Sequence, residues 1–170
     1  MSDRKRRQPQ SPPAFRQAVE ETPAIAKFYK DGLKALDEVD RNRISCKSTR
    51  DLTGSVYVEE ALRDHQVRSQ DRLDEPAWWD YGVGYRAKVF WIEVHPASSS
   101  HIQDVIKKHD WLKTWLKEEA PKLKELPCDF VWIASGAVNL PSGSRQRKIL
   151  AEKAIKFAGQ HLNLDMPPER

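Results

Sequence analysis

The sequence has few cysteines, no long apolar run and no hydrophobic stretch after its first methionine. Its two cysteines, Cys46 and Cys128, are 82 positions apart without CxxC spacing, which excludes a disulfide framework and a cysteine-based zinc site. The longest apolar run, residues 89–92, reaches Val94 only across Glu93 and is far shorter than the ~20 residues that span a bilayer. The basic start lacks the apolar region of a secretory signal. We therefore expect a cytoplasmic protein that is not associated with a membrane.

Charge and aromatic content predict one folded domain and a tail. The 170 residues include 39% hydrophobic residues and six tryptophans, enough for a core, although the mean hydropathy is −0.74. Residues 1–13 carry +3 of the net +4 charge, so we expect a disordered basic tail followed by a single domain over residues 14–170. The tail is either a solubilising extension or an arm that binds phosphate.

Hydrophobic spacing predicts helical and extended segments in the first part of the chain. Apolar residues recur at helical spacing over 23–39, with Thr22 as the expected N-cap. A short strand is expected at 44–46 and a turn at 51–55, which contains Gly54. A second helix is expected at 56–65, although residues 55–58 alone also fit a strand.

The second part of the chain predicts a β-hairpin and a βαβ unit. Two strands, 78–85 and 88–94, form the hairpin, and a long helix with capping-box spacing at Ser100 and Gln103 ends near Pro121. A buried strand at 130–134 completes the βαβ unit, and a last helix at 144–158 has Gly159 as its C-cap. The predicted fold is α+β or α/β, with a mixed central sheet flanked by helices.

Acidic residues near the hairpin are the strongest sign of chemistry. Glu93 and His95 point to the same face of their strand because side chains alternate, whereas Val94 points to the other face. A carboxylate in an apolar strand needs a partner or a metal ion. With Asp80 on the neighbouring strand, the oxygen ligands suit Mg²⁺ or Mn²⁺.

This pattern resembles the PD-(D/E)XK nucleases over roughly residues 56–136. The resemblance implies a core of a helix, three strands, a helix and a strand, with Glu60 or Glu59 as the helix acid, Asp80 and Glu93 as metal ligands, and His95 where the family has lysine. His95 would then act as a base or a metal ligand.

Two departures from the family pattern concern the lysine and the first strand. Lys107 or Lys88 is expected to replace the missing lysine from a neighbouring element. The first core strand is expected either at 66–76 or at 44–46.

Charge is separated along the domain. Residues 59–80 carry a net charge of −4, and residues 145–156 carry +4. A metal-dependent nuclease needs an acidic pocket beside a basic surface, and Arg145, Arg147 and Lys148 are the predicted nucleic-acid contacts. The same separation also fits a homodimer or a protein partner.

The main alternative to the nuclease is a non-catalytic protein-interaction module of bacterial origin. In that interpretation Asp80, Glu93 and His95 form a structural hydrogen-bond network. Residues 78–85 and 93–97 resemble segments of uncharacterised bacterial proteins, and that resemblance implies no activity. We expect His95, His101 and His109 not to share one ion, because His101 and His109 are more than two helical turns apart.

Overall fold

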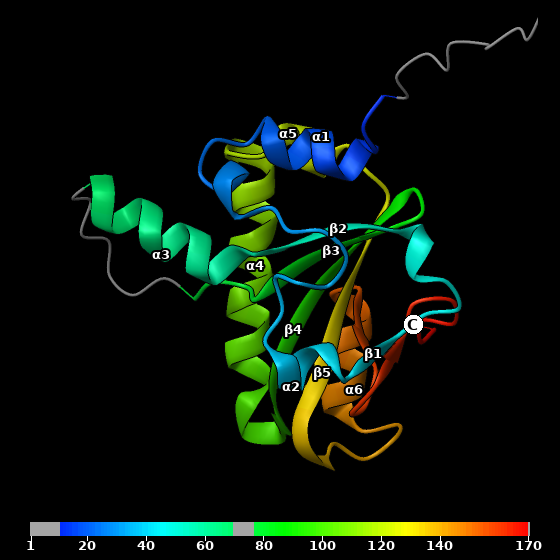
Figure 1. Cartoon of the computed structure of the whole chain (residues 1–170). Helices are drawn as coiled ribbons and strands as arrows, with labels where there is room; N and C mark the ends of the chain where they lie inside the picture. The colour runs from blue at the N-terminus through cyan, green and yellow to red at the C-terminus, as the bar shows by residue number, and fades with distance from the viewer. Residues whose placement is uncertain (1–10, 70–76, 170) are drawn as a thin grey trace, which may run out of the picture.

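A five-stranded mixed sheet in the order β2-β3-β4-β5-β6 is the centre of the fold. The computed structural model describes residues 11–69 and 77–169. The strands, in chain order, are β2 (Leu52–Tyr57), β3 (Tyr81–Tyr85), β4 (Lys88–Ser98), β5 (Cys128–Asn139) and β6 (Ile155–Phe157). The predicted α+β class with a mixed sheet flanked by helices is therefore confirmed (Figure 1).

Helices and a small second sheet surround these strands. The helices are α1 (Ala14–Glu20), η1 (Ala26–Phe28), α2 (Glu38–Arg41), η2 (Thr49–Asp51), α3 (Val58–Ser69), η3 (Ser99–His101), α4 (Ile102–Glu118), α5 (Pro121–Lys124) and α6 (Arg145–Glu152). The second sheet pairs β1 (Ile44–Ser45) in parallel with β7 (Leu162–Asn163), which confirms the short strand expected at 44–46.

The predicted hairpin is β3 and β4, which pair in an antiparallel manner and are joined at Arg86 and Ala87. Arg86 adopts a φ of 53°, the left-handed conformation that a tight turn requires. Gly82 lies opposite Trp91, and a Cβ atom at Gly82 would stand 2.7 Å from the Trp91 ring. The glycine therefore gives the buried indole its space in the sheet.

The predicted βαβ unit is β4, α4 and β5, and its two strands are parallel. Every residue of the predicted apolar stripe of α4 is buried: Ile102, Val105, Ile106, His109, Leu112, Trp115 and Leu116. The expected capping box is absent, because η3 precedes α4 and no side chain caps the first turn of α4. Burial of the stripe thus positions this helix without help from a cap.

The two faces of the sheet carry separate hydrophobic clusters. One cluster joins Trp91 and Trp132 to apolar residues of α1, α3, α4 and α6. The other joins Tyr81, Ile92 and Ile133 to the segment around α2 and to β7. Figure 1 shows α4 along one face of the sheet and α2 with β1 in front of the other. Glu93 belongs to the strand between the two clusters and is buried completely.

The helix expected at 23–39 is wrong. Only η1 and the start of α2 are helical there, and Gly32 has a φ of 54°. The backbone of Lys30 pairs instead with Ser55 through two hydrogen bonds of 2.9 Å. Ile25 and Leu36 are buried, so tertiary contacts satisfy the apolar spacing without a continuous helix.

The turn expected at 51–55 is also wrong, because Asp51 is the last residue of η2 and residues 52–55 belong to β2. Gly54, with a φ of 128°, lets the Tyr29 ring approach the strand, since an added Cβ atom would lie 2.2 Å from that ring. β2 is the first strand of the five-stranded sheet in chain order, and residues 44–45 belong to the small second sheet, so the alternative of 44–46 for the first core strand is wrong. Of the alternative at 66–76, residues 66–69 lie in α3. Residues 70–76 lie outside the described residues.

The last predicted helix ends early. α6 begins after Ser144, whose hydroxyl accepts a hydrogen bond from the Arg147 backbone N–H, and it ends at Glu152. Ala154 has a φ of 58°, and residues 155–157 then pair in parallel with β5 as β6. A free edge of β5 therefore takes a segment that local spacing assigned to a helix. Of the predicted disordered tail, residues 1–10 lie outside the described residues, and residues 11–13 have no regular structure.

Candidate functional site

Asp80 and Glu93 meet where β3 begins. Tyr81 pairs with Ile92, so Asp80, just before β3, stands beside Glu93 on β4. The Asp80 backbone N–H donates to Glu93 Oε2 at 3.1 Å, and the Val94 backbone N–H donates to Asp80 Oδ2 at 2.9 Å. The Val58 N–H donates to the Asp80 carbonyl at 2.8 Å, which ties the start of α3 to the same point. Each carboxylate is therefore fixed by one oxygen atom.

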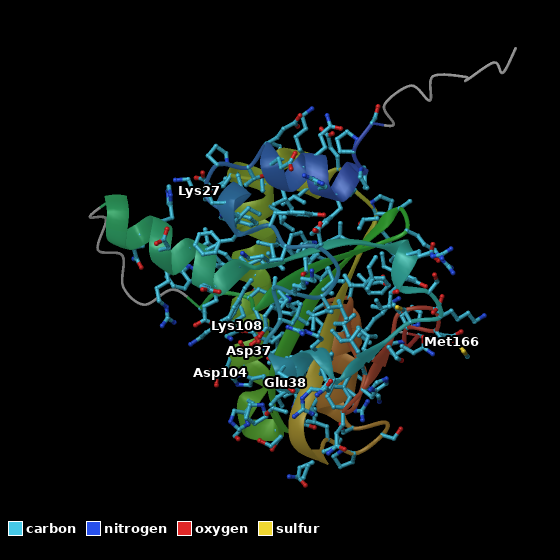
Figure 2. The ribbon with its side chains drawn as sticks, viewed as in Figure 1. Lys27, Asp37, Glu38, Asp104, Lys108 and Met166 are labelled. Carbon is cyan, nitrogen blue, oxygen red and sulfur yellow. The ribbon has the colours of Figure 1, made fainter. Side chains whose placement is uncertain are left out.

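The other carboxylate oxygens face Lys108 of α4. Its ammonium group forms an ion pair with Glu93 Oε1 and lies 3.9 Å from Asp80 Oδ1. Figure 2 shows Lys108 on α4, with Asp104 one helical turn nearer the start of the helix. Three elements thus bring two acids and one base together in a place where their side chains are mostly buried.

Burial dominates the electrostatics of this cluster. Burial raises the pKa of the Asp80 carboxyl to about 7, and Lys108 and the Val94 N–H offset only part of the rise. Burial and then the charge of Asp80 raise the pKa of Glu93 well above its ordinary value. Burial lowers the pKa of Lys108, but Glu93 and Asp80 outweigh it, so the pKa of that ammonium is raised overall. One ammonium does not balance two carboxylates here.

Of the two predicted helix acids, Glu59 is the one at the site. Its hydrogen bond and its charge both raise the pKa of the Asp80 carboxyl, and it also pairs with Arg63. Glu60 is exposed. Successive residues of a helix point about 100° apart, so only one of the pair faces the sheet. Glu59, and not Glu60, is therefore the helix acid that lies beside Asp80.

His95 faces the same side of β4 as Glu93, as predicted. Its Nδ1 is 3.6 Å from Glu93 Oε1, and its Nε2 is buried without a hydrogen-bond partner among the described residues. Burial, followed by the charges of Lys108 and His101, lowers the pKa of the His95 imidazole. The Trp132 Nε1–H donates to the His95 carbonyl at 3.0 Å and fixes this part of β4. His95 is therefore held mainly in its neutral form.

The other two histidines lie in different surroundings. The His101 ring centroid is 5.1 Å from that of His95, and its Nδ1 is 2.7 Å from the Ser98 hydroxyl. His109 is buried beside Trp79 and Phe130, and burial lowers the pKa of its imidazole to about 4. Over residues 11–69 and 77–169, no group of three or more His, Cys, Asp or Glu side chains is arranged to hold a metal ion.

Lys108 is the site residue that the sequence analysis missed, and the expected substitutes are elsewhere. Lys107 is exposed, and Lys88 pairs with Asp129. The signal was present in the helical phase: at 100° per residue, Lys107 is nearly opposite the middle of the buried stripe of α4, while Lys108 borders it. A long side chain at the border of a stripe reaches the sheet beneath it.

The predicted basic contacts lie on α6. Arg145 and Lys148 are exposed. Arg147 is held in place, because its Nε and Nη2 donate to the Leu140 carbonyl at 3.2 and 3.0 Å and its guanidinium lies 4.3 Å from the centre of the Phe157 ring. The three cations therefore combine two exposed surface charges with one guanidinium held by hydrogen bonds.

Comparison with protein-family models, with curated proteins and with solved structures found no match. Among the helices of the described residues, none has the length and apolar character needed to cross a membrane.

Proposed function

We propose that this chain is a PD-(D/E)XK-like, metal-dependent phosphodiesterase that acts on nucleic acid. The observation that carries the proposal is the meeting of Asp80, Glu93 and Lys108 from the start of β3, from β4 and from α4. In this proposal Lys108 takes the part that the family gives to its motif lysine, His95 is an additional base, and Glu59 is the auxiliary acid.

The order of the elements supports the proposal. α1 precedes three antiparallel neighbours, β2, β3 and β4, and these are followed by α4 and by β5 parallel to β4. This order of helix, three strands, helix and strand is the one that the resemblance implies. The chain departs from the family pattern at α3, because the resemblance puts the acid on the first helix of the core, whereas Glu59 lies on a helix between β2 and β3.

The donor atoms suit Mg²⁺ or Mn²⁺. Asp80 Oδ1 and Glu93 Oε1 are not used by backbone N–H groups, and both face a cation, the Lys108 ammonium. Mg²⁺ is commonly held by one or two carboxylates, with waters and substrate phosphate completing its shell, so two carboxylates are sufficient. The metal would stabilise developing charge on the phosphate. Lys108, no longer the sole counterion of the acids, would offer its charge to a phosphate oxygen.

One observation favours the alternative, a non-catalytic interaction module. Glu93 has no exposed surface, and Lys108 already occupies its outward oxygen. In that case the cluster is a buried ion-pair network that fixes β3, β4 and α4 relative to one another.

A cleavage assay tests the proposal with a matched control. Labelled single-stranded and duplex DNA and RNA are incubated with the full chain and Mn²⁺ or Mg²⁺. Glu93→Gln should lower the cleavage rate at least ~100-fold, because it removes one of the two charged oxygen ligands. Asp129→Asn, which removes a carboxylate that two lysines hold at the start of β5, should change the rate by less than about threefold. Metal-dependent cleavage that survives Glu93→Gln, or no cleavage of any substrate by the wild type, would contradict the proposal.

A further inference from the structure

A cavity of about 220 Å³ lies between α6, β6 and the loop that follows β5. Its lining includes Ser142, Gly143, Arg147, Leu150, Ile155 and Phe157. An apolar cavity of about 150 Å³ is large enough to hold benzene, so this one has room for a larger planar ring. Neither the carboxylate site nor the proposed reaction uses it.

The lining combines a flat cation, an aromatic ring and polar groups with two buried apolar side chains. Two hydrogen bonds to Leu140 hold the Arg147 guanidinium over the Phe157 ring, as described above. Leu150 and Ile155 are buried, so they supply an apolar floor. The Ser142 hydroxyl and the Glu169 carboxylate add polar groups at the same cavity. Guanidinium and aromatic planes with a few polar groups are the surfaces on which nucleobases stack.

The cavity is at the same level of the sheet as the carboxylates. Glu93 pairs with Trp132 in the register of β4 and β5, and Trp132 pairs with Phe157 in the register of β5 and β6. The rings of Trp132 and Phe157 touch, with centroids 5.2 Å apart, so both are on the same face. Neighbouring strands are about 4.8 Å apart, so the backbones at Glu93 and Phe157 are about 10 Å apart across the sheet.

We infer that the cavity beside Arg147 and Phe157 binds an unpaired nucleobase of the nucleic-acid strand whose phosphate is cleaved at Asp80 and Glu93. The inference rests on the proposed function and deepens it, because it makes a single-stranded or locally opened strand the substrate. Arg145 and Lys148, exposed on α6, contact the flanking phosphates.

Binding is measured without cleavage, using fluorescently labelled single-stranded oligonucleotides in EDTA. The first set is intact. In the second set each oligonucleotide lacks one base, and the position of the missing base moves by one nucleotide from each oligonucleotide to the next. Wild-type protein should bind the abasic oligonucleotide about 5- to 100-fold more weakly at one or two of these places, since stacking of a base supplies that range. Phe157→Leu should bind both sets equally.

Phe157 also contacts the buried Trp132, so Phe157→Leu could disturb the core. A second variant therefore tests the cavity without changing a core residue. Ala151 is exposed and lines the cavity, so Ala151→Phe fills the cavity from the surface of α6. It should abolish the difference between intact and abasic oligonucleotides. Gln146→Phe places the same ring on α6 at a residue outside the lining, and it should keep the difference. Lys148→Ala should weaken binding to both sets equally. It should also reduce the slope of log Kd against the logarithm of salt concentration by about one.

The outcomes separate this inference from the proposed function. Equal binding of intact and abasic oligonucleotides by the wild type, or an unchanged difference in Ala151→Phe, overturns the base site even where Glu93-dependent cleavage is found. A difference that Ala151→Phe abolishes supports the base site even where no cleavage is found, and then only the phosphodiesterase proposal fails.

Discussion

Two carboxylate clusters on the same sheet have opposite charge balances. At the start of β3, Asp80 and Glu93 share one lysine, Lys108, whereas at the start of β5, Asp129 lies between two lysines, Lys88 and Lys156. Burial raises the pKa of Asp80 to about 7. Burial also acts to raise the pKa of Asp129, but the two lysines outweigh it and the pKa is lowered.

The difference separates a stabilising ion pair from a site that has room for another cation. The Asp129 cluster has one more positive than negative group, so its carboxylate is fully neutralised. When both carboxyls are ionised, Asp80 and Glu93 carry one more negative charge than Lys108 balances, and the fold bears the cost of burying that charge, which is why both carboxyl pKa values are raised. Such a cost is typical of functional sites, where charged groups are held in a costly arrangement that a ligand relieves.

Removing one lysine from each cluster should give the largest difference in stability between the two clusters. Lys108→Met leaves two buried carboxylates without a counterion and should lower the free energy of unfolding by about 3 kcal/mol at pH 8. The loss should shrink at pH 5, where the carboxyls take up protons. Lys88→Met leaves Lys156 beside Asp129 and should cost about 1 kcal/mol or less. Urea unfolding at both pH values measures the pair, and equal losses would show that the two clusters are equivalent.

Divalent metal should stabilise only the cluster that has excess negative charge. Mg²⁺ or Mn²⁺ at ~100 times its Kd should add about 2.7 kcal/mol to the free energy of unfolding, seen as a rise in Tm. The rise should be larger at pH 8 than at pH 6, because the Asp80 carboxyl, with a pKa of about 7, must lose its proton to bind. Asp129→Asn should keep the rise and Asp80→Asn should lose it. A rise that persists in Asp80→Asn places the metal elsewhere.

The pH dependence of stability should have opposite signs at the two clusters. The pKa of Asp80 is higher in the folded state, so its contribution is favourable at low pH and is lost as pH rises toward 7. The pKa of Asp129 is lower in the folded state, so its contribution is present above the ordinary aspartate pKa and is lost as pH falls. Asp80→Asn should therefore be more stable than wild type at pH 7, by up to about 4 kcal/mol, and nearly equal to it near pH 4.

Asp129→Asn supplies the control for this pH series, since it should be less stable than wild type at pH 7. Taking differences from the wild type removes contributions that the variants share, including His109, whose imidazole pKa is about 4. If Asp80→Asn is less stable than wild type at pH 7, the Asp80 carboxylate is a stabilising group like Asp129.

The sequence predicted correctly those elements whose own apolar spacing determines which side chains are buried. The runs of β4 and β5 and the stripe of α4 are buried as their spacing required. The failures came where distant contacts decided the structure. Ser55 pairs with Lys30 in place of a helix at 23–39, and the edge of β5 takes residues 155–157 from the expected last helix.

The same distinction applies to the candidate site. Strand alternation and the pairing expected for the hairpin were enough to bring Asp80, Glu93 and His95 together, although Asp80 lies just before β3 and not within the strand expected at 78–85. The choice between Glu59 and Glu60, and between Lys107 and Lys108, depends on which side of each helix meets the sheet. Packing between elements fixes those helical phases, and the apolar stripe of α4 is the sequence signal that favours Lys108 over Lys107.

Calorimetric titration of Mn²⁺ into the full chain at pH 8 tests most directly whether Asp80 and Glu93 form a cation site. We predict one ion bound per chain in the wild type and in Asp129→Asn, and binding at least tenfold weaker in Glu93→Gln. No binding by the wild type up to millimolar Mn²⁺, or equal binding by Glu93→Gln, would contradict the account and leave the cluster as a buried ion-pair network.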